Sequence, residues 1–169
     1  MPAVSTKLID TASDFDLGPL SWVHGEIGHA FARGLDFLSA FRGAPSDPAS
    51  LKQAKAQIHQ AAGAIQMVGL DAVVVYTDEI ERQLVRLNEL APAEIEPACR
   101  LVDRACRRLG IFLDELIGGV APQPLKLFPE YEAMQRARGV QAASPSDLFF
   151  PDLNPRGPAL ATLPPIPAD

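Results

Sequence analysis

The sequence is poor in the side chains from which most active sites and metal centres are built. It contains three histidines and two cysteines, and it lacks the glycine-rich and histidine-rich motifs that bind nucleotides or zinc. His24 and His29 would point about 140° apart on one helix, and Cys99 and Cys106 would lie about 10 Å apart along another, too far for a disulfide. We therefore expect no catalytic site, no metal site and no bound cofactor in this segment.

Excess positive charge and long hydrophobic runs are also missing. The net charge is −6, whereas nucleic acids and anionic membrane surfaces attract basic proteins. No apolar run approaches the roughly 18 residues that a membrane span needs, and the N-terminus does not have the pattern of a signal peptide. These features predict a cytoplasmic chain with no nucleic acid partner and no membrane insertion.

Proline is unevenly distributed and divides the chain. Ten of the 16 prolines lie after residue 120, and the end of the chain has the composition of a linker. We expect a flexible N-terminus over 1–16, a helical domain over 17–153, and a proline-rich linker over 154–169 that leads to a further domain.

Apolar side chains recur at helical spacing in the domain. The expected helices cover about 19–41, with Trp22 in its apolar stripe, then 48–68, 70–90 and 97–118. Short connections favour antiparallel neighbours. The fold class is therefore all-α, an antiparallel up-down four-helix bundle, with an additional short helix over 128–138, capped by Gly139, and an irregular tail.

His59 stands out on the second expected helix. It directly follows Ile58 of the apolar stripe and therefore lies on the flank of that stripe. Ala62 and Gly63 keep the helix surface beside the imidazole free of bulk, although a mid-helix glycine costs roughly 1 kcal/mol relative to alanine. A close approach by another molecule would give this glycine a purpose.

Further residues of the same helix bear on the chemistry of His59. Lys55 and Lys52 place positive charge one and two turns before it, where an added phosphoryl group would sit. Gln66 is too distant to orient the ring, so a residue of a neighbouring helix is needed to fix its tautomer. A flank histidine without chemistry is the simpler interpretation of His59 taken alone.

The stretch His59-Gln60-Ala61-Ala62-Gly63 resembles the His-x-x-Lys-Gly pattern of the histidine phosphotransfer (Hpt) domain, with Ala62 where that family carries lysine. "LSWVHGEI", "IHQAAGAIQMVGL", "EIERQL", "LKLFPEYEAMQRARG" and "SDLFFPDL" follow one another in the chain. Together they look similar to the N-terminal domain of the type IV pilus chemosensory hybrid histidine kinases (ChpA or PilL type), and to the related FimL proteins.

This resemblance implies a bundle of Hpt type with His59 as phosphoryl acceptor. It implies a two-component phosphorelay that controls twitching motility, and a longer parent that is a histidine kinase. The implied partners are a response-regulator receiver domain, the histidine kinase core and a polar scaffold protein, which suggests localisation at the cell pole. ATP and magnesium would be used by the parent kinase or by the partner.

Two other functions stay open. The first is a degenerate Hpt-like scaffold of the FimL kind, which binds a regulatory or polar-localisation partner without phosphotransfer. The second is a dimerisation domain that pairs through Trp22, Val23, Phe149 and Phe150. The two phenylalanines are expected to fold back onto the bundle, and an exposed docking patch is the alternative.

Overall fold

The computed structural model describes residues 17–148, and in this part of the chain all regular secondary structure is helical, with no strand. It contains α1 (Gly18–Gly43), α2 (Pro48–Val68), α3 (Asp71–Arg86), α4 (Pro92–Ile117) and α5 (Phe128–Ala137), with 3-10 turns η1 (Pro124–Leu127) and η2 (Pro145–Leu148). The predicted all-helical bundle is therefore confirmed. The predictions for 1–16 and for 149–169, which include Phe149 and Phe150, lie outside the described residues.

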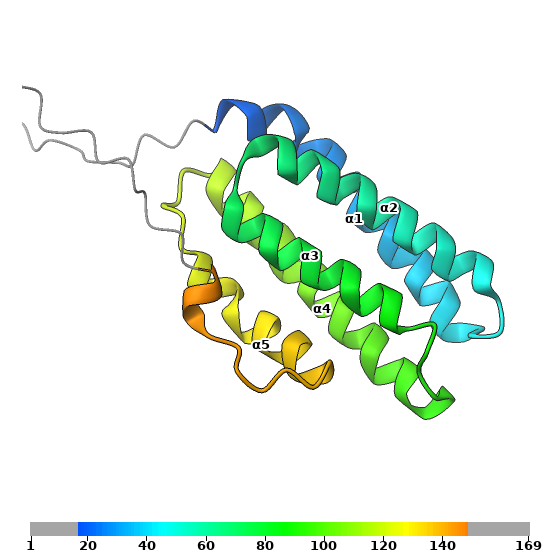
Figure 1. The fold of residues 1–169 in the computed structure, drawn as a ribbon. Helices are drawn as coiled ribbons and strands as arrows, with labels where there is room; N and C mark the ends of the chain where they lie inside the picture. The colour runs from blue at the N-terminus through cyan, green and yellow to red at the C-terminus, as the bar shows by residue number, and fades with distance from the viewer. Residues whose placement is uncertain (1–16, 149–169) are drawn as a thin grey trace, which may run out of the picture.

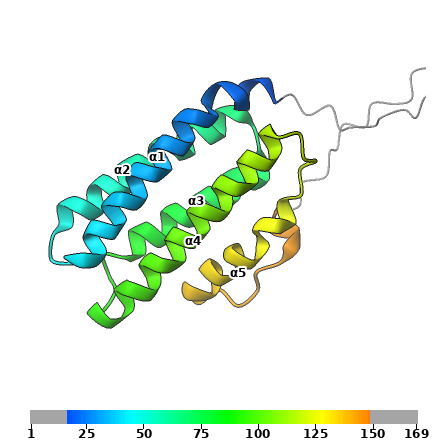
Figure 2. The same ribbon diagram turned by 180° about the vertical axis from the view of Figure 1, so that it is seen from behind.

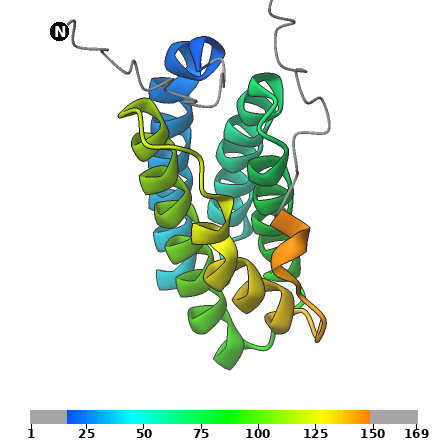
Figure 3. The same ribbon diagram turned by 90° about the vertical axis from the view of Figure 1, so that its left-hand side faces the viewer.

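The four long helices lie side by side and form the bundle (Figure 1). α1 packs along α2, and seen from behind it also lies beside α4 (Figure 2). α5 and η2 form a second layer, in which α5 packs against α3 and α4 while η2 packs against α3 (Figure 3). α2 and α3 are neighbours, and their shared outer face carries the candidate site.

The buried residues follow the predicted stripes of α2, α3 and α4. In each of α2 and α3, five positions at helical spacing form a stripe that is completely buried, and Ile58 and Ile80 are fully enclosed. At Gly34 an added Cβ would lie 2.8 Å from Ile58 Cγ1, so glycine allows α1 to approach α2 closely here. The buried members of these two stripes are Leu51, Ala54, Ile58, Ala61, Ile65, Val73, Thr77, Ile80, Leu84 and Leu87.

The two ends of α2 follow directly from its sequence. The Asp47 carboxylate accepts a hydrogen bond from the Ala49 backbone N–H at 3.0 Å, and Pro48 takes the first helical position, where no N–H is needed. Gly69 ends the helix with φ 77°, a conformation that favours glycine. The expected range 48–68 is confirmed. Because the stripe through Ile58 faces the core, His59, the next residue, lies on the flank of the helix.

The structure corrects three other expectations. Trp22 is 87% exposed, and Leu20 occupies the buried position at the start of the α1 stripe. α4 begins at Pro92, five residues before the expected start at Pro97, because the Glu94 carboxylate accepts the Ala91 backbone N–H and caps an earlier first turn. α3 ends at Arg86 rather than near residue 90, since tight i to i−3 turns replace the last helical turn.

Candidate functional site

His59 projects from α2 and is hydrogen-bonded to Glu81 of α3. The His59 Nδ1 atom and the Glu81 Oε1 atom are 2.7 Å apart, although the residues are 22 positions apart in the sequence. The His59 side chain is 79% exposed and that of Glu81 is 29% exposed. The pair thus combines a fully presented imidazole with a carboxylate that is held against the bundle.

The bonding pattern assigns different roles to the two ring nitrogens. An ionised carboxylate only accepts hydrogen bonds, so His59 Nδ1 carries the proton and donates it to Glu81. In the neutral ring, Nε2 then holds the free electron pair. Nε2 is also the ring nitrogen farther from the backbone, so the exposed imidazole presents a nucleophilic atom to solvent.

Both members of the pair are placed in the same way by their helices. His59 directly follows the buried Ile58, and Glu81 directly follows the buried Ile80. Each side chain therefore starts one residue, about 100°, round from the core stripe of its own helix. Because α2 and α3 pack against each other, these two flanks meet at one edge of their interface.

A buried ionic cluster on the other side of α3 reinforces this orientation. The Glu79 carboxylate is fully buried and accepts hydrogen bonds from the Arg138 guanidinium at 2.7 and 2.9 Å. The Gln83 amide donates to Glu79 at 3.0 Å and to the Met134 carbonyl at 2.7 Å, which ties α3 to α5. Because Glu79 is bonded on the α5 side of α3, Glu81, two residues further along the helix, faces α2.

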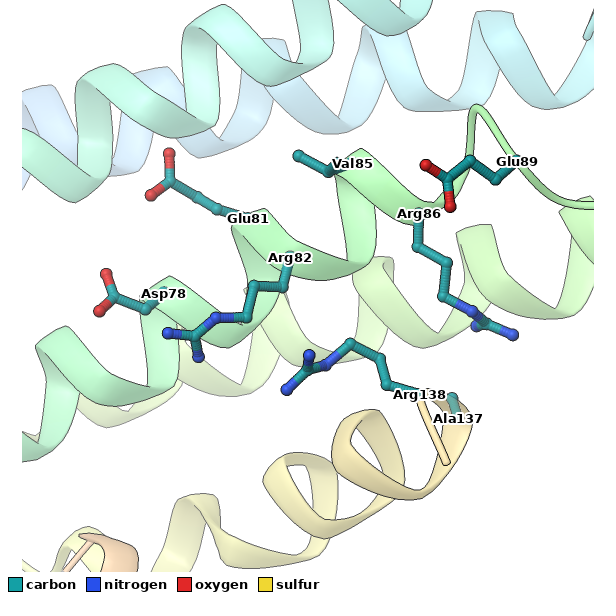
Figure 4. Close-up of a pocket in the computed structure, with 8 residues that line it drawn as sticks. All are labelled: Asp78, Glu81, Arg82, Val85, Arg86, Glu89, Ala137 and Arg138. Atoms are coloured by element: carbon teal, nitrogen blue, oxygen red, sulfur yellow. The ribbon is translucent and has the colours of Figure 1, made fainter. Parts of the chain in front are cut away.

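Figure 4 shows the two sides of α3. Glu81 and Val85 project towards α2, whereas Arg82 points to the other side, towards Arg138 at the end of α5. An open groove of about 800 Å³ runs along α3 and is lined by residues of both sides, Glu81 and Val85 on one and the arginines Arg82, Arg86 and Arg138 on the other. The Arg82 guanidinium lies 3.4 Å from a carboxylate oxygen of Glu79, so Glu79 partly neutralises the positive charge of this arginine.

The residues of α2 that the sequence singled out fall into two groups. Lys55 lies one turn before His59, lines a small pocket together with His59 and Glu81, and is partly buried, which lowers the pKa of its amine. Gly63 is exposed, and no atom lies within 4 Å of the position where a Cβ would be, so the helix surface beside the imidazole is bare. The structure thus brings Lys55 and Gly63 to the same face as His59.

The remaining predicted residues lie apart from the imidazole nitrogens. Lys52 and Gln66 are exposed, and neither is hydrogen-bonded to His59. Ala62 is buried, so this position points into the packing of the bundle. A cation at this site therefore comes from Lys55 alone among the residues of α2 that the sequence indicated.

Sequence reasoning missed Glu81 as the partner of His59. Glu79 and Glu81 are two residues apart, so they face different ways on one helix, and the structure shows this difference in their separate partners. The signal that would have identified Glu81 is its position directly after Ile80, which matches the position of His59 after Ile58.

A second histidine–carboxylate pair joins α1 to α4. His24 Nε2 donates to Asp114 Oδ1 at 2.7 Å, and the His24 side chain is 32% exposed while that of Asp114 is 70% exposed. This separates His24 from His29, which is exposed and has no hydrogen-bond partner within residues 17–148. The three histidines of the chain thus occupy three different environments.

The two cysteines are buried, free thiols on α4. Burial raises the pKa of Cys99 to about 11 and also raises the pKa of Cys106. Both thiols are therefore protonated at neutral pH and poorly nucleophilic. Within residues 17–148, no group of three or more histidine, cysteine or acidic side chains is arranged to hold a metal ion.

Comparisons of the chain with protein-family models, with curated proteins and with solved structures find no match. In the described part of the chain, no helix combines the length and the apolar character needed to cross a membrane. The class that the fold and the site define is thus an all-helical bundle that carries an exposed, carboxylate-bound histidine.

Proposed function

We propose that this chain is a histidine phosphotransfer module in which His59 accepts a phosphoryl group at Nε2. The observation that carries the proposal is the bond between His59 Nδ1 and Glu81, which leaves Nε2 unprotonated on a 79% exposed ring. We further propose that α1 to α4 form an up-down bundle of Hpt type, which is the arrangement that the resemblance of the sequence implies.

The transfer step follows from the roles of the two nitrogens. The Nε2 electron pair attacks the phosphorus of the donor, a P–N bond forms, and the bond from phosphorus to the leaving group breaks. The Nδ1 proton stays on the ring, which then carries a positive charge next to the Glu81 carboxylate. Lys55 lies on the same face and stabilises the negative phosphoryl oxygens.

The partners of this module supply the remaining chemistry. The site needs no metal of its own, because a kinase core would bring ATP and magnesium, and a receiver domain would bring its acceptor aspartate. The bare helix surface at Gly63 leaves room for such a partner to approach the imidazole. Within this proposal, the chain belongs to a chemosensory phosphorelay that controls type IV pili and twitching motility.

Phosphoramidate, a small phosphoryl donor that needs no partner protein, provides the first test. We expect His59 to be phosphorylated at Nε2 about tenfold faster than the exposed, unpaired His29, because Glu81 orients and polarises its ring. Site-resolved mass spectrometry and phosphorus NMR of the intact protein measure both rates in one sample. His59→Gln must remove the fast signal, and His24→Gln serves as the matched control that retains it.

One observation favours a second function, that of a scaffold without phosphotransfer. Ala62 occupies the position of the family's lysine and is buried, so the usual cation beside the histidine is absent. A scaffold would bind a regulatory or polar-localisation partner through the same face. Equal labelling rates at His59 and His29 would exclude the acceptor role and leave this alternative.

A further inference from the structure

A pocket lies directly beside the His59 imidazole, between α2 and α3. Its volume is about 310 Å³, at the lower end of the range for small-molecule sites. The apolar part of its lining is formed by Ala56, Leu84 and Val85, of which Leu84 is buried and Val85 is exposed. Lys55, His59 and Glu81 complete the lining, and they do so almost entirely through their carbon atoms.

Lys55, which lines the pocket, carries an amine that has no counterion in the described part of the chain. It is partly buried, and it makes no ion pair or hydrogen bond with any residue in the range 17–148. The other part-buried lysine, Lys126, donates to the Glu115 carboxylate at 2.8 Å. Lys52 is exposed to solvent, so Lys55 alone among these three lysines combines partial burial with a missing partner.

Glu81, the acidic residue of the pocket, is not the counterion of Lys55. Glu81 Oε1 accepts a hydrogen bond from His59 Nδ1–H, and no ion pair joins Glu81 to Lys55. An amphipathic anion can therefore pair with the Lys55 ammonium at the edge of the pocket while its apolar part covers Leu84 and Val85. A cation of the same shape would meet Lys55 as a repulsive neighbour, and the Glu81 carboxylate that would attract it is already hydrogen-bonded to His59.

We propose that this pocket binds a small amphipathic anion, a molecule with a carboxylate at one end of a short apolar body. The carboxylate pairs with the Lys55 ammonium, and the body lies on Ala56, Leu84 and Val85 and reaches the His59 ring. Occupancy covers His59 and competes with its partners. This last consequence rests on the proposed phosphotransfer function, whereas the binding itself does not.

The binding is tested with 4-phenylbutanoate as the probe, and with 4-phenylbutylamine and 4-phenylbutanol as matched cationic and neutral controls. Two-dimensional NMR titration of the protein should show saturable shifts of the Leu84 and Val85 methyl signals. We expect the carboxylate to bind about tenfold more tightly than the amine, because the carboxylate pairs with the free Lys55 ammonium, whereas the amine is repelled by Lys55 and finds Glu81 already bonded to His59. Equal affinities of the three probes, or shifts that do not saturate, overturn the proposal.

Variants of α2 locate the site. Lys55→Met should weaken binding of 4-phenylbutanoate by about tenfold, whereas Lys52→Met, one turn away on the exposed surface, should leave it within about twofold. Ala56→Leu fills the pocket and should abolish binding while the helix signals stay unchanged. Equal affinity in wild type and Lys55→Met contradicts the assignment.

The consequence for His59 is measured separately. Saturating 4-phenylbutanoate should slow phosphoramidate labelling of His59 at least about threefold and leave labelling of His29 unchanged. Binding without protection of His59 means that the anion sits in the pocket but does not cover Nε2. Absence of any fast labelling of His59 rejects the phosphotransfer function, while the NMR titration still decides whether the pocket binds anions.

Discussion

Two histidine–carboxylate hydrogen bonds lie on two different faces of the described bundle, and they leave different ring nitrogens free. On the α2–α3 face His59 is bound to Glu81, and on the α1–α4 face His24 is bound to Asp114, each at 2.7 Å. Each histidine is followed four residues later by an exposed glycine, Gly63 or Gly28. A search by pattern or by distance alone would treat these two sites as equivalent.

The ring nitrogen that is bonded separates the two sites. Glu81 binds His59 through Nδ1, so the distal Nε2 is free on a ring that is 79% exposed. Asp114 binds His24 through Nε2, so the free nitrogen is Nδ1, next to the backbone, on a ring that is 32% exposed. The comparison shows that a carboxylate on the inner nitrogen leaves the outer nitrogen of His59 free, whereas a carboxylate on the outer nitrogen occupies it at His24.

The largest difference between the two sites is expected in transfer from a protein donor, such as a phosphorylated receiver domain. His59→Gln should lower the rate at least about 100-fold, because the positioned nucleophile is lost. His24→Gln should change it less than about twofold. Radiolabel transfer on a rapid time scale measures both, and comparable losses in the two variants would show that the distinction between the pairs is wrong.

The two carboxylates provide the next test. Glu81→Gln keeps the side-chain length but removes the charge that stabilises the phosphorylated ring, so labelling of His59 by phosphoramidate should slow up to about tenfold. Asp114→Asn is the matched control and should leave the labelling of His59 unchanged. Nitrogen-15 NMR of the imidazoles reports the tautomers, and a mixture of tautomers at His59 in the wild type would contradict the assignment.

The two glycines should behave alike in stability. No atom lies within 4 Å of a Cβ placed at Gly63 or Gly28, so alanine fits at both positions. Gly63→Ala and Gly28→Ala should each raise the free energy of unfolding by up to about 1 kcal/mol, because alanine favours the helix. Urea unfolding measures this free energy. A loss of stability in Gly63→Ala alone would indicate that Gly63, unlike Gly28, packs closely against another group.

The smallest expected effect is the pH dependence of Lys55, which has no counterpart at His24. Partial burial lowers the pKa of this amine from the ordinary 10.5. Since the group is charged below its pKa, Lys55 loses its positive charge at a lower pH than an exposed lysine does. Carbon-13 reductive methylation followed by NMR titration measures this, and a midpoint at or above 10.5 would refute it.

Local patterns predicted most of the helices correctly. The range 48–68 was correct because Asp47, Pro48 and Gly69 specify the two ends of α2 within a few residues. The start of α4 was misplaced because Pro97 was taken as the start, although the Glu94 cap and Pro92 favour an earlier one. Trp22 was misplaced because a large apolar side chain fits helical spacing whether or not a neighbouring element covers it.

The candidate site was predicted only in part, because helical spacing relates residues of one helix and not residues of different helices. His59, Lys55 and Gly63 lie on one helix, so their spacing in the sequence places them on one face. Glu81 and the Arg138 contact that orients its helix come from segments 22 and 79 residues away from His59, and helical periodicity contains no information about such contacts.

The sequence by itself determined the all-helical class, the bounds of α2, the buried stripes and the placement of a histidine on the flank of one stripe. These features depend on neighbours within about one or two helical turns. Only the tertiary structure decided which nitrogen of each histidine is free, because that choice depends on the carboxylate that a packed neighbour presents. It places Glu81 at Nδ1 of His59 and Asp114 at Nε2 of His24, and this difference separates a candidate phosphoryl acceptor from an interhelical contact.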